Sequence, residues 1–139
     1  MTQLWGVMRQ DVERAWVFVG GLVAEACACS QLHTPEAIRD DLLDGTAQLW
    51  VAWEGDVNDK VIRACTVTKL ERRGAVTWCR AILVAGDQPD DWFDHLAMIE
   101  KWAKANGAQQ MNFIGRCGLE KWLKPRGYKR THFLMEKAL

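Results

Sequence analysis

The clearest helical pattern in this chain is WFDHLAMIEKWAKANG, residues 92–107. Its apolar side chains recur every three or four residues and therefore share one helix face; they are Trp92, Leu96, Ile99, Trp102 and Ala103. The pair Asn106-Gly107 is a typical helix stop. An alternating run precedes this helix at 75–84, and a short apolar run follows it at 110–114. Two strands joined by a helix in this way are predicted to be parallel neighbours in one sheet.

The segments on either side of this unit complete a mixed pattern of strands and helices. Turn-rich residues separate the strand-like runs in the middle of the chain, which predicts an antiparallel meander. The other predicted elements are a strand at 4–9, a helix from Asp11, a helix from Thr34 to Gly45, strands at 47–54 and 61–70, a short helix at 119–123 and a strand at 128–135. The predicted order is β-α-α-β-β-β-α-β-α-β, which is an α/β fold with a mixed sheet.

Length and composition indicate one ordinary globular domain spanning residues 1–139. Eighteen basic and eighteen acidic residues give zero formal net charge, which excludes a strongly basic nucleic-acid binder judged on total charge. The longest apolar stretch, residues 15–24, is ended by Glu25 and is too short to span a membrane. We therefore expect no membrane association, and the lack of an export pattern at the N-terminus favours a cytoplasmic protein.

Five cysteines occur without C-x-x-C spacing, and we interpret them as reduced thiols. Cys27 and Cys29 are two residues apart with no nearby pair of histidines, which is a weak metal-binding pattern. The acidic loop before residue 92 also lacks the spacing and glycine of a calcium loop. No metal site is therefore expected.

Two segments and the element order together resemble the GNAT superfamily of N-acetyltransferases. Residues 96–107 resemble the central helix of that family. The run GRCGLEKWLKPRGY, residues 115–128, resembles its final helix, and Gly127-Tyr128 occupies the place of the family's Gly-Phe or Gly-Tyr pair. Small phage-encoded members of the fold show a similar segment. The resemblance implies a GNAT-like mixed sheet and a location in the host cytoplasm or the virion if the chain is phage-encoded.

The resemblance also implies acetyl-CoA as cofactor, held in a V-shaped gap between the strands at 75–84 and 110–114. The cofactor-binding residues carried over in this way are Ile82, Leu83 and Val84 along the first strand, with Gln88 and Arg116. Gln88 begins the loop that would hold the diphosphate on backbone N–H groups at a helix N-terminus.

This sequence departs from the family pattern at several positions. Asp91 and Phe93 stand where the phosphate loop of the family has glycine, and acidic residues gather around that loop. Leu123 stands where many members have a tyrosine that acts as an acid. No catalytic residue is singled out by the sequence. Three side chains could serve as a general base, and they are Glu54, His95 and Glu100.

Charge and tryptophan content offer a second line of interpretation. From Gly115 to the end, seven basic and two acidic residues give +5, so the rest of the chain carries −5. The basic segment from Arg116 to Arg130 could face nucleic acid, a CoA phosphate or an acidic protein surface, or could simply be solvated. The eight tryptophans could stack on bases, although the helical spacing of several predicts core packing.

Two hypotheses follow from these observations. The first is an acyl-CoA-dependent N-acyltransferase with a degenerate cofactor loop, acting on an amine substrate. The alternative is a non-catalytic structural or adaptor protein on the same fold, such as a phage virion or internal protein that acts through its basic C-terminal face on a protein or nucleic-acid partner. Fold alone does not decide between them, because function is determined by the site.

Overall fold

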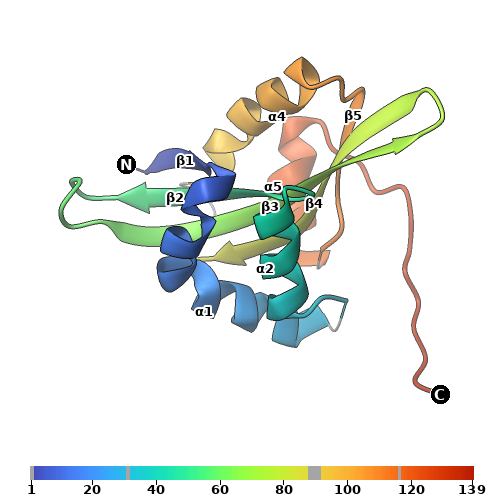
Figure 1. The fold of residues 1–139 in the computed structure, drawn as a ribbon. Coiled ribbons are helices and arrows are strands. Elements are labelled where there is room, and N and C mark those ends of the chain that lie inside the picture. The colour runs from blue at the N-terminus through green and yellow to red at the C-terminus, as the bar shows by residue number, and fades with distance from the viewer. Residues whose placement is uncertain (1, 31, 88–91, 116) are drawn as a thin grey trace.

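The structure, a computed structural model, describes residues 2–30, 32–87, 92–115 and 117–139. Over these residues the chain forms one five-stranded sheet in the order β1-β2-β3-β4-β5 (Figure 1). The strands are β1 (Gln3–Val7), β2 (Gln48–Glu54), β3 (Val61–Arg73), β4 (Val76–Gly86) and β5 (Gln110–Phe113). The first four pair antiparallel, and β5 pairs parallel to β4. The predicted meander and the predicted parallel pair are therefore both confirmed.

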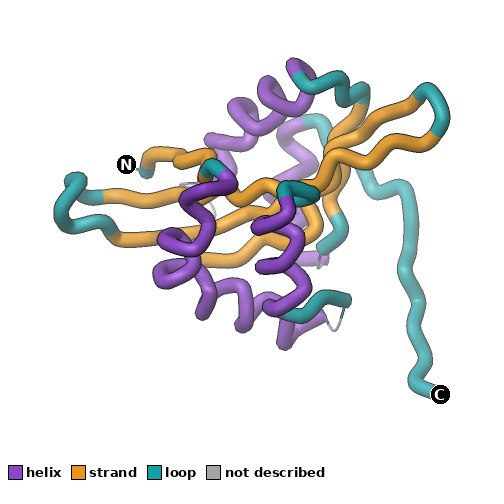
Figure 2. The backbone as a smooth tube through the Cα atoms, viewed as in Figure 1, coloured by secondary structure: helices purple, strands orange, loops and turns teal. Residues whose placement is uncertain are grey.

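Helices cover both faces of this sheet (Figure 2). They are α1 (Val12–Ser30), α2 (Pro35–Asp44), α4 (Leu96–Ala105) and α5 (Glu120–Leu123), with single 3-10 turns η1 (Arg9–Asp11), η2 (Phe93–His95), η3 (Cys117–Leu119) and η4 (Lys124–Arg126). One core lies under α1 and α2, where Val19 and Ile38 pack with Val51 of β2. A second core lies under α4 and α5, where Leu96 and Leu123 pack with Ala52, the next residue of that strand. Successive strand residues point to opposite faces, so β2 serves both cores.

The predicted helix at 92–107 begins later than its apolar pattern indicates. Residues 93–95 form the 3-10 turn η2, and the α-helix starts at Leu96. Phe93 is only 1% exposed, because this turn aims its ring into the second core. The first apolar residues of the pattern thus belong to a packed turn rather than to the first turn of α4.

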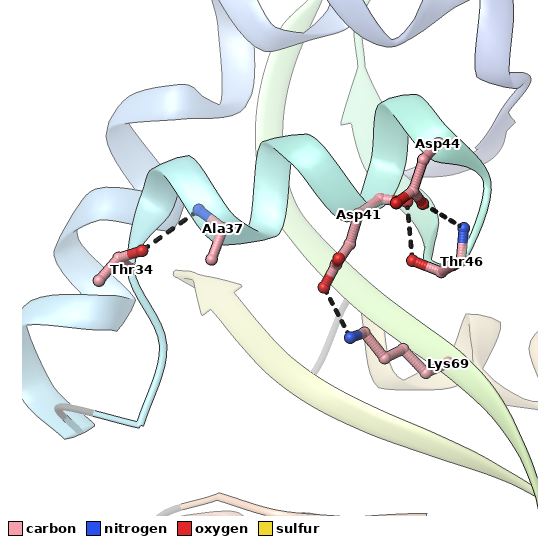
Figure 3. A network of polar contacts seen from close by, with 6 residues as sticks. All are labelled: Thr34, Ala37, Asp41, Asp44, Thr46 and Lys69. Atoms are coloured by element: carbon pink, nitrogen blue, oxygen red, sulfur yellow. Dashed lines mark hydrogen bonds and ion pairs between the residues drawn. The ribbon is translucent and has the colours of Figure 1, made fainter.

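Local side-chain chemistry explains where α2 begins and ends (Figure 3). The Thr34 hydroxyl accepts a hydrogen bond from the Ala37 backbone N–H at 3.2 Å, which is a helix N-cap. Gly45 adopts a left-handed φ of 86°, which ends the helix. The Asp44 carboxylate then accepts a hydrogen bond from the Thr46 backbone N–H at 2.9 Å, and this bond lowers the pKa of Asp44. The predicted start and end of this helix are confirmed.

An ion pair joins α2 to the sheet. The Lys69 ammonium of β3 lies 2.6 Å from the Asp41 carboxylate of α2 (Figure 3). Both side chains are about one-third exposed, so solvent screens the pair and its contribution to stability is small. The pair orients the helix, whereas the apolar contacts of Ile38 and Leu42, both 1% exposed, hold it in place.

The predicted strand at 128–135 is wrong. No strand follows β5 in the described residues, and the chain after η4 runs as an extended tail away from the body (Figure 1). Phe133 and Met135 are 80% and 91% exposed. Alternation of polar and apolar residues made this segment look like a strand, but a strand also needs backbone partners. No helix among the described residues is long and apolar enough to cross a membrane.

Candidate functional site

The parallel pair at the edge of the sheet separates partway along its length. Residues 78–81 of β4 pair with 110–113 of β5, and the Ile114 N–H donates to the Ala81 carbonyl at 3.1 Å. β5 ends at Phe113, whereas β4 continues to Gly86. In the described part of the chain, residues 82–86 of β4 therefore have no partner strand on the side of β5.

A β-bulge lies at the point where the two strands separate. Thr68 of β3 faces Ala81, and the preceding residue Val67 faces Leu83, so Ile82 is an extra residue in β4. A bulge bends its strand and increases the local twist. The bend starts directly after the last contact with β5, which accounts for the divergence of β4 from its neighbour.

The bulge also decides which backbone groups of β4 face the open side. The Asp87 N–H donates to the Arg63 carbonyl at 3.1 Å, so Asp87 directs its backbone toward β3. Backbone groups of successive strand residues point to alternate sides. The N–H and C=O groups of Val84 and Gly86 therefore point toward the side that β5 has left. This open edge, defined as the backbone of Val84 and Gly86, can bind an extended chain that carries amide groups.

The predicted cofactor-binding residues take different places at this site. Val84 lies on the open edge and is half-buried. Ile82 and Leu83 are 7% and 6% exposed and pack in the core under α1. Their side chains therefore belong to the core beneath the gap between β4 and β5. Gln88 and Arg116 lie outside the described residues. Sequence analysis missed Gly86, whose positive φ of 135° and approach to the Arg63 carbonyl exclude a side chain.

An aromatic stack fills the turn that begins α4. The rings of Trp92 and Phe93 stack with centroids 4.2 Å apart, and Phe93 is nearly parallel to Trp122 of α5 at 6.1 Å. The resemblance places a phosphate-loop glycine at position 93, but this chain uses the position for a core ring. The fold here therefore joins α5 to the start of α4 by apolar packing.

Arg126 lies on the same stack. Its guanidinium is 5.5 Å from the Phe93 ring centroid, donates to the Asp94 carboxylate at 2.9 Å and donates to the Trp122 carbonyl at 2.7 Å. A fixed cation thus lies at the start of α4, next to a carboxylate that is 75% exposed. In the sequence, Arg126 stands out only as a member of the basic segment, and that membership does not predict its location at the start of α4.

A small cavity lies between α4 and the sheet, lined by Trp50, Trp92, His95 and Phe113 among others. Its volume of about 20 Å³ admits one water molecule. The Trp92 indole N–H is buried and has no hydrogen-bond partner among the residues that the structure describes. The cavity is therefore too small for an acyl group.

The three candidate bases each have a separate partner. Glu54 forms an ion pair with Arg63, and the His95 ring lies 2.8 Å from the Thr2 hydroxyl. Glu100 accepts a hydrogen bond from the Tyr128 hydroxyl at 3.0 Å. Burial, followed by the adjacent Glu100 carboxylate, raises the pKa of Tyr128 well above its usual value. These contacts do not assign a general base.

A core leucine occupies the position at which many family members have a tyrosine that acts as a general acid. Leu123 is 8% exposed and belongs to the core under α4 and α5. No hydroxyl is therefore supplied from this position. Tyr128 instead packs edge-on against Phe113, with centroids 5.3 Å apart, which anchors the start of the C-terminal tail.

Part of the positive charge in the C-terminal segment is neutralised by local contacts. Arg126 pairs with Asp94, and Arg130 pairs with Glu120. Lys121 lies 5.1 Å from the Trp122 ring centroid. The pair with Asp94 offsets one basic charge beyond the sequence count, whereas Glu120 is already included in that count and Lys121 keeps its charge on the ring.

No protein-family model and no curated protein matches the sequence. Solved structures do match its fold. An aminoglycoside N-acetyltransferase in complex with CoA is 11% identical with a TM-score of 0.68, covering 100% of this chain and 95% of its own. A putative acetyl transferase from Pyrococcus furiosus is 15% identical with a TM-score of 0.69, covering 100% of both chains. A predicted acetyltransferase with acetyl-CoA from Clostridium acetobutylicum is 11% identical with a TM-score of 0.64, covering 99% and 96%.

These likenesses extend over the whole chain at low identity and therefore establish the fold. The chain has the mixed α/β fold of the GNAT acetyltransferases, as the sequence resemblance predicted.

Proposed function

We propose that this chain is a GNAT-superfamily N-acyltransferase that binds an acyl-CoA along the open edge of β4. The observation that carries the proposal is the bulge at Ile82, after which the backbone of Val84 and Gly86 faces the side that β5 has left. The pantetheine arm of CoA is an extended chain with amide groups, so it fits an edge that offers strand-like donors and acceptors. Solved neighbours that carry CoA and acetyl-CoA support this assignment.

Arg126 is the described residue best placed for the phosphate end of the cofactor. It is fixed at the start of α4 by its bond to the Trp122 carbonyl, and it can exchange the exposed Asp94 carboxylate for a phosphate oxygen. Bidentate binding of phosphate is the usual role of a guanidinium. The aspartates of the neighbouring loop oppose this binding, so we expect modest affinity that falls with added salt.

The reaction would be direct transfer from the thioester, which supplies an activated acyl group. An amine substrate attacks the thioester carbonyl, the C–N bond forms, the C–S bond breaks, and the amine proton leaves as the thiol departs. The chain's own contribution is to orient the thioester along β4 and to donate a backbone N–H to the developing oxyanion.

One observation favours a second candidate function, a non-catalytic protein on the same fold. Phe93 and Leu123 are both buried core residues. The family resemblance implies a phosphate-loop glycine at position 93 and a tyrosine that acts as a general acid at position 123. A chain that uses these positions for packing could have exchanged catalysis for a structural or adaptor role. Binding of acyl-CoA separates the two candidates.

The test is a thermal-shift titration of the purified protein with acetyl-CoA at low salt. Ligand at 100 times its Kd adds about 2.7 kcal/mol of stability, which raises Tm by about 9 °C for a chain of this length. Arg126→Gln should weaken the shift, whereas Arg73→Gln at the β3–β4 hairpin, a matched loss of charge, should leave it unchanged. The absence of a shift at millimolar acetyl-CoA would reject the acyltransferase proposal and favour the non-catalytic one.

A further inference from the structure

A second recess lies at the other edge of the sheet, beside β1. It has a volume of about 360 Å³ and is lined by residues of β1, the start of α1, the end of β2 and the β2–β3 loop. The side chains that characterise it are Trp5, Arg14, Trp53 and Lys60. The strand order places β2 and β3 between this recess and the open edge of β4. The recess is therefore separate from the proposed acyl-CoA site.

The strand register brings two indole rings to one face. Gln3 of β1 lies directly opposite Trp53 of β2, and Trp5 lies two residues further along β1. Residues two apart on a strand share a face, so Trp5 and Trp53 are diagonal neighbours. The Lys60 ammonium lies 5.4 Å from the Trp5 ring centroid and 5.1 Å from that of Trp53. Both distances are within cation–π range, so the aromatic pair holds this charge inside the recess.

The charged side chains that line the recess are both cations, Arg14 and Lys60. No carboxylate lines it among the described residues. The Arg14 side chain is 71% exposed, and it forms an ion pair at 3.2 Å with the Asp11 carboxylate of η1, whose side chain is 28% exposed. The indole N–H groups of Trp5 and Trp53 have no hydrogen-bond partner in the described part of the protein, and neither N–H group is fully buried. Two cations and two free N–H donors thus surround two aromatic rings.

We propose that this recess binds a nucleotide whose base takes the place of the Lys60 ammonium on the indole rings of Trp5 and Trp53, while Lys60 and Arg14 bind its phosphate. A planar ring with an attached anion is the chemistry that uses both features, because a base stacks on an indole and a phosphate accepts from ammonium and guanidinium groups. Two cations would repel an amine, and a metal ion would find no carboxylate ligands.

The test uses AMP as the probe and the indole N–H resonances of the ¹⁵N-labelled protein as the readout. The chain has eight tryptophans, and Trp→Phe variants assign their resonances. AMP should shift the Trp5 and Trp53 resonances saturably at low salt. Adenosine, which lacks the phosphate, and inorganic phosphate, which lacks the ring, should each bind at least tenfold more weakly. A trinucleotide that shifts the same resonances at lower concentration would identify a nucleic-acid strand as the source of the nucleotide.

Matched variants keep the proposal separate from folding and from acyl-CoA binding. Trp53→Ala should weaken AMP binding about 5- to 150-fold, the range for loss of one base–aromatic stack. Lys60→Gln should weaken it severalfold, and Lys137→Gln in the exposed tail should not. Because AMP resembles part of CoA, the AMP titration is repeated with saturating acetyl-CoA. Shifts that vanish under acetyl-CoA, that fall on other tryptophans or that persist in both recess variants would overturn the proposal.

Discussion

Replacing Phe93 with alanine should remove the packing that joins the start of α4 to α5. The Phe93 side chain is 1% exposed, stacks on Trp92 at 4.2 Å and faces Trp122 at 6.1 Å. Deleting a fully buried phenylalanine side chain costs about 3–5 kcal/mol, because its transfer free energy is lost and a cavity remains. At about 0.3 kcal/mol per kelvin of unfolding entropy for 139 residues, Tm should fall by roughly 10–17 °C.

The assay is urea unfolding followed by circular dichroism, with thermal melts in parallel. Phe18→Ala is the matched control, because that ring is 59% exposed on α1 and its loss should cost less than about 1 kcal/mol. If Phe93→Ala cost no more than Phe18→Ala, position 93 would not be a core position. The aromatic stack would then not hold α5 to the start of α4.

Two further predictions concern α2 and the buried thiols. Thr34→Ala should lower the unfolding free energy by about 1 kcal/mol in urea titrations, because the N-cap bond to Ala37 is lost, and no change would reject that cap. Burial raises the pKa of Cys65 to about 12 and that of Cys79 to about 11. Unfolded thiols ionise first, so stability is complete below about pH 8.5 and should fall by about 1.4 kcal/mol per pH unit per thiol as pH rises toward 11–12. Cys65→Ala should flatten this slope between pH 9 and 10.5, and an equal slope in that variant would contradict the assignment.

Local signals in the sequence were sufficient for most of the elements. Thr34-Pro35 and Gly45 mark the ends of α2. The helix between the strands at 75–84 and 110–114 predicts the parallel pairing that β4 and β5 form. These features depend on capping, backbone conformation and side-chain period, which are properties of neighbouring residues.

The geometry of the site is set by strand register and by contacts between distant residues, which the sequence alone does not show. The extra residue at Ile82 is a property of the register between β3 and β4, and either strand alone looks regular. The bond between Arg126 and Asp94 joins residues 32 positions apart. The apolar pattern through Trp92 and Phe93 indicated a helix, but their packing on α5 favours a 3-10 turn. The predicted strand at 128–135 was wrong for the same reason, because alternation of polar and apolar residues does not show whether a partner strand is present.

Hydrogen exchange shows whether the backbone of Val84 and Gly86 binds the acyl-CoA. Amide exchange is measured by NMR with and without saturating acetyl-CoA. The amides of Val84 and Gly86 should exchange at least tenfold more slowly with the ligand, whereas those of β1 at the opposite edge should change little. Acetyl-CoA binding that leaves both β4 amides unprotected, or that protects β1 instead, would contradict binding of the acyl-CoA along β4.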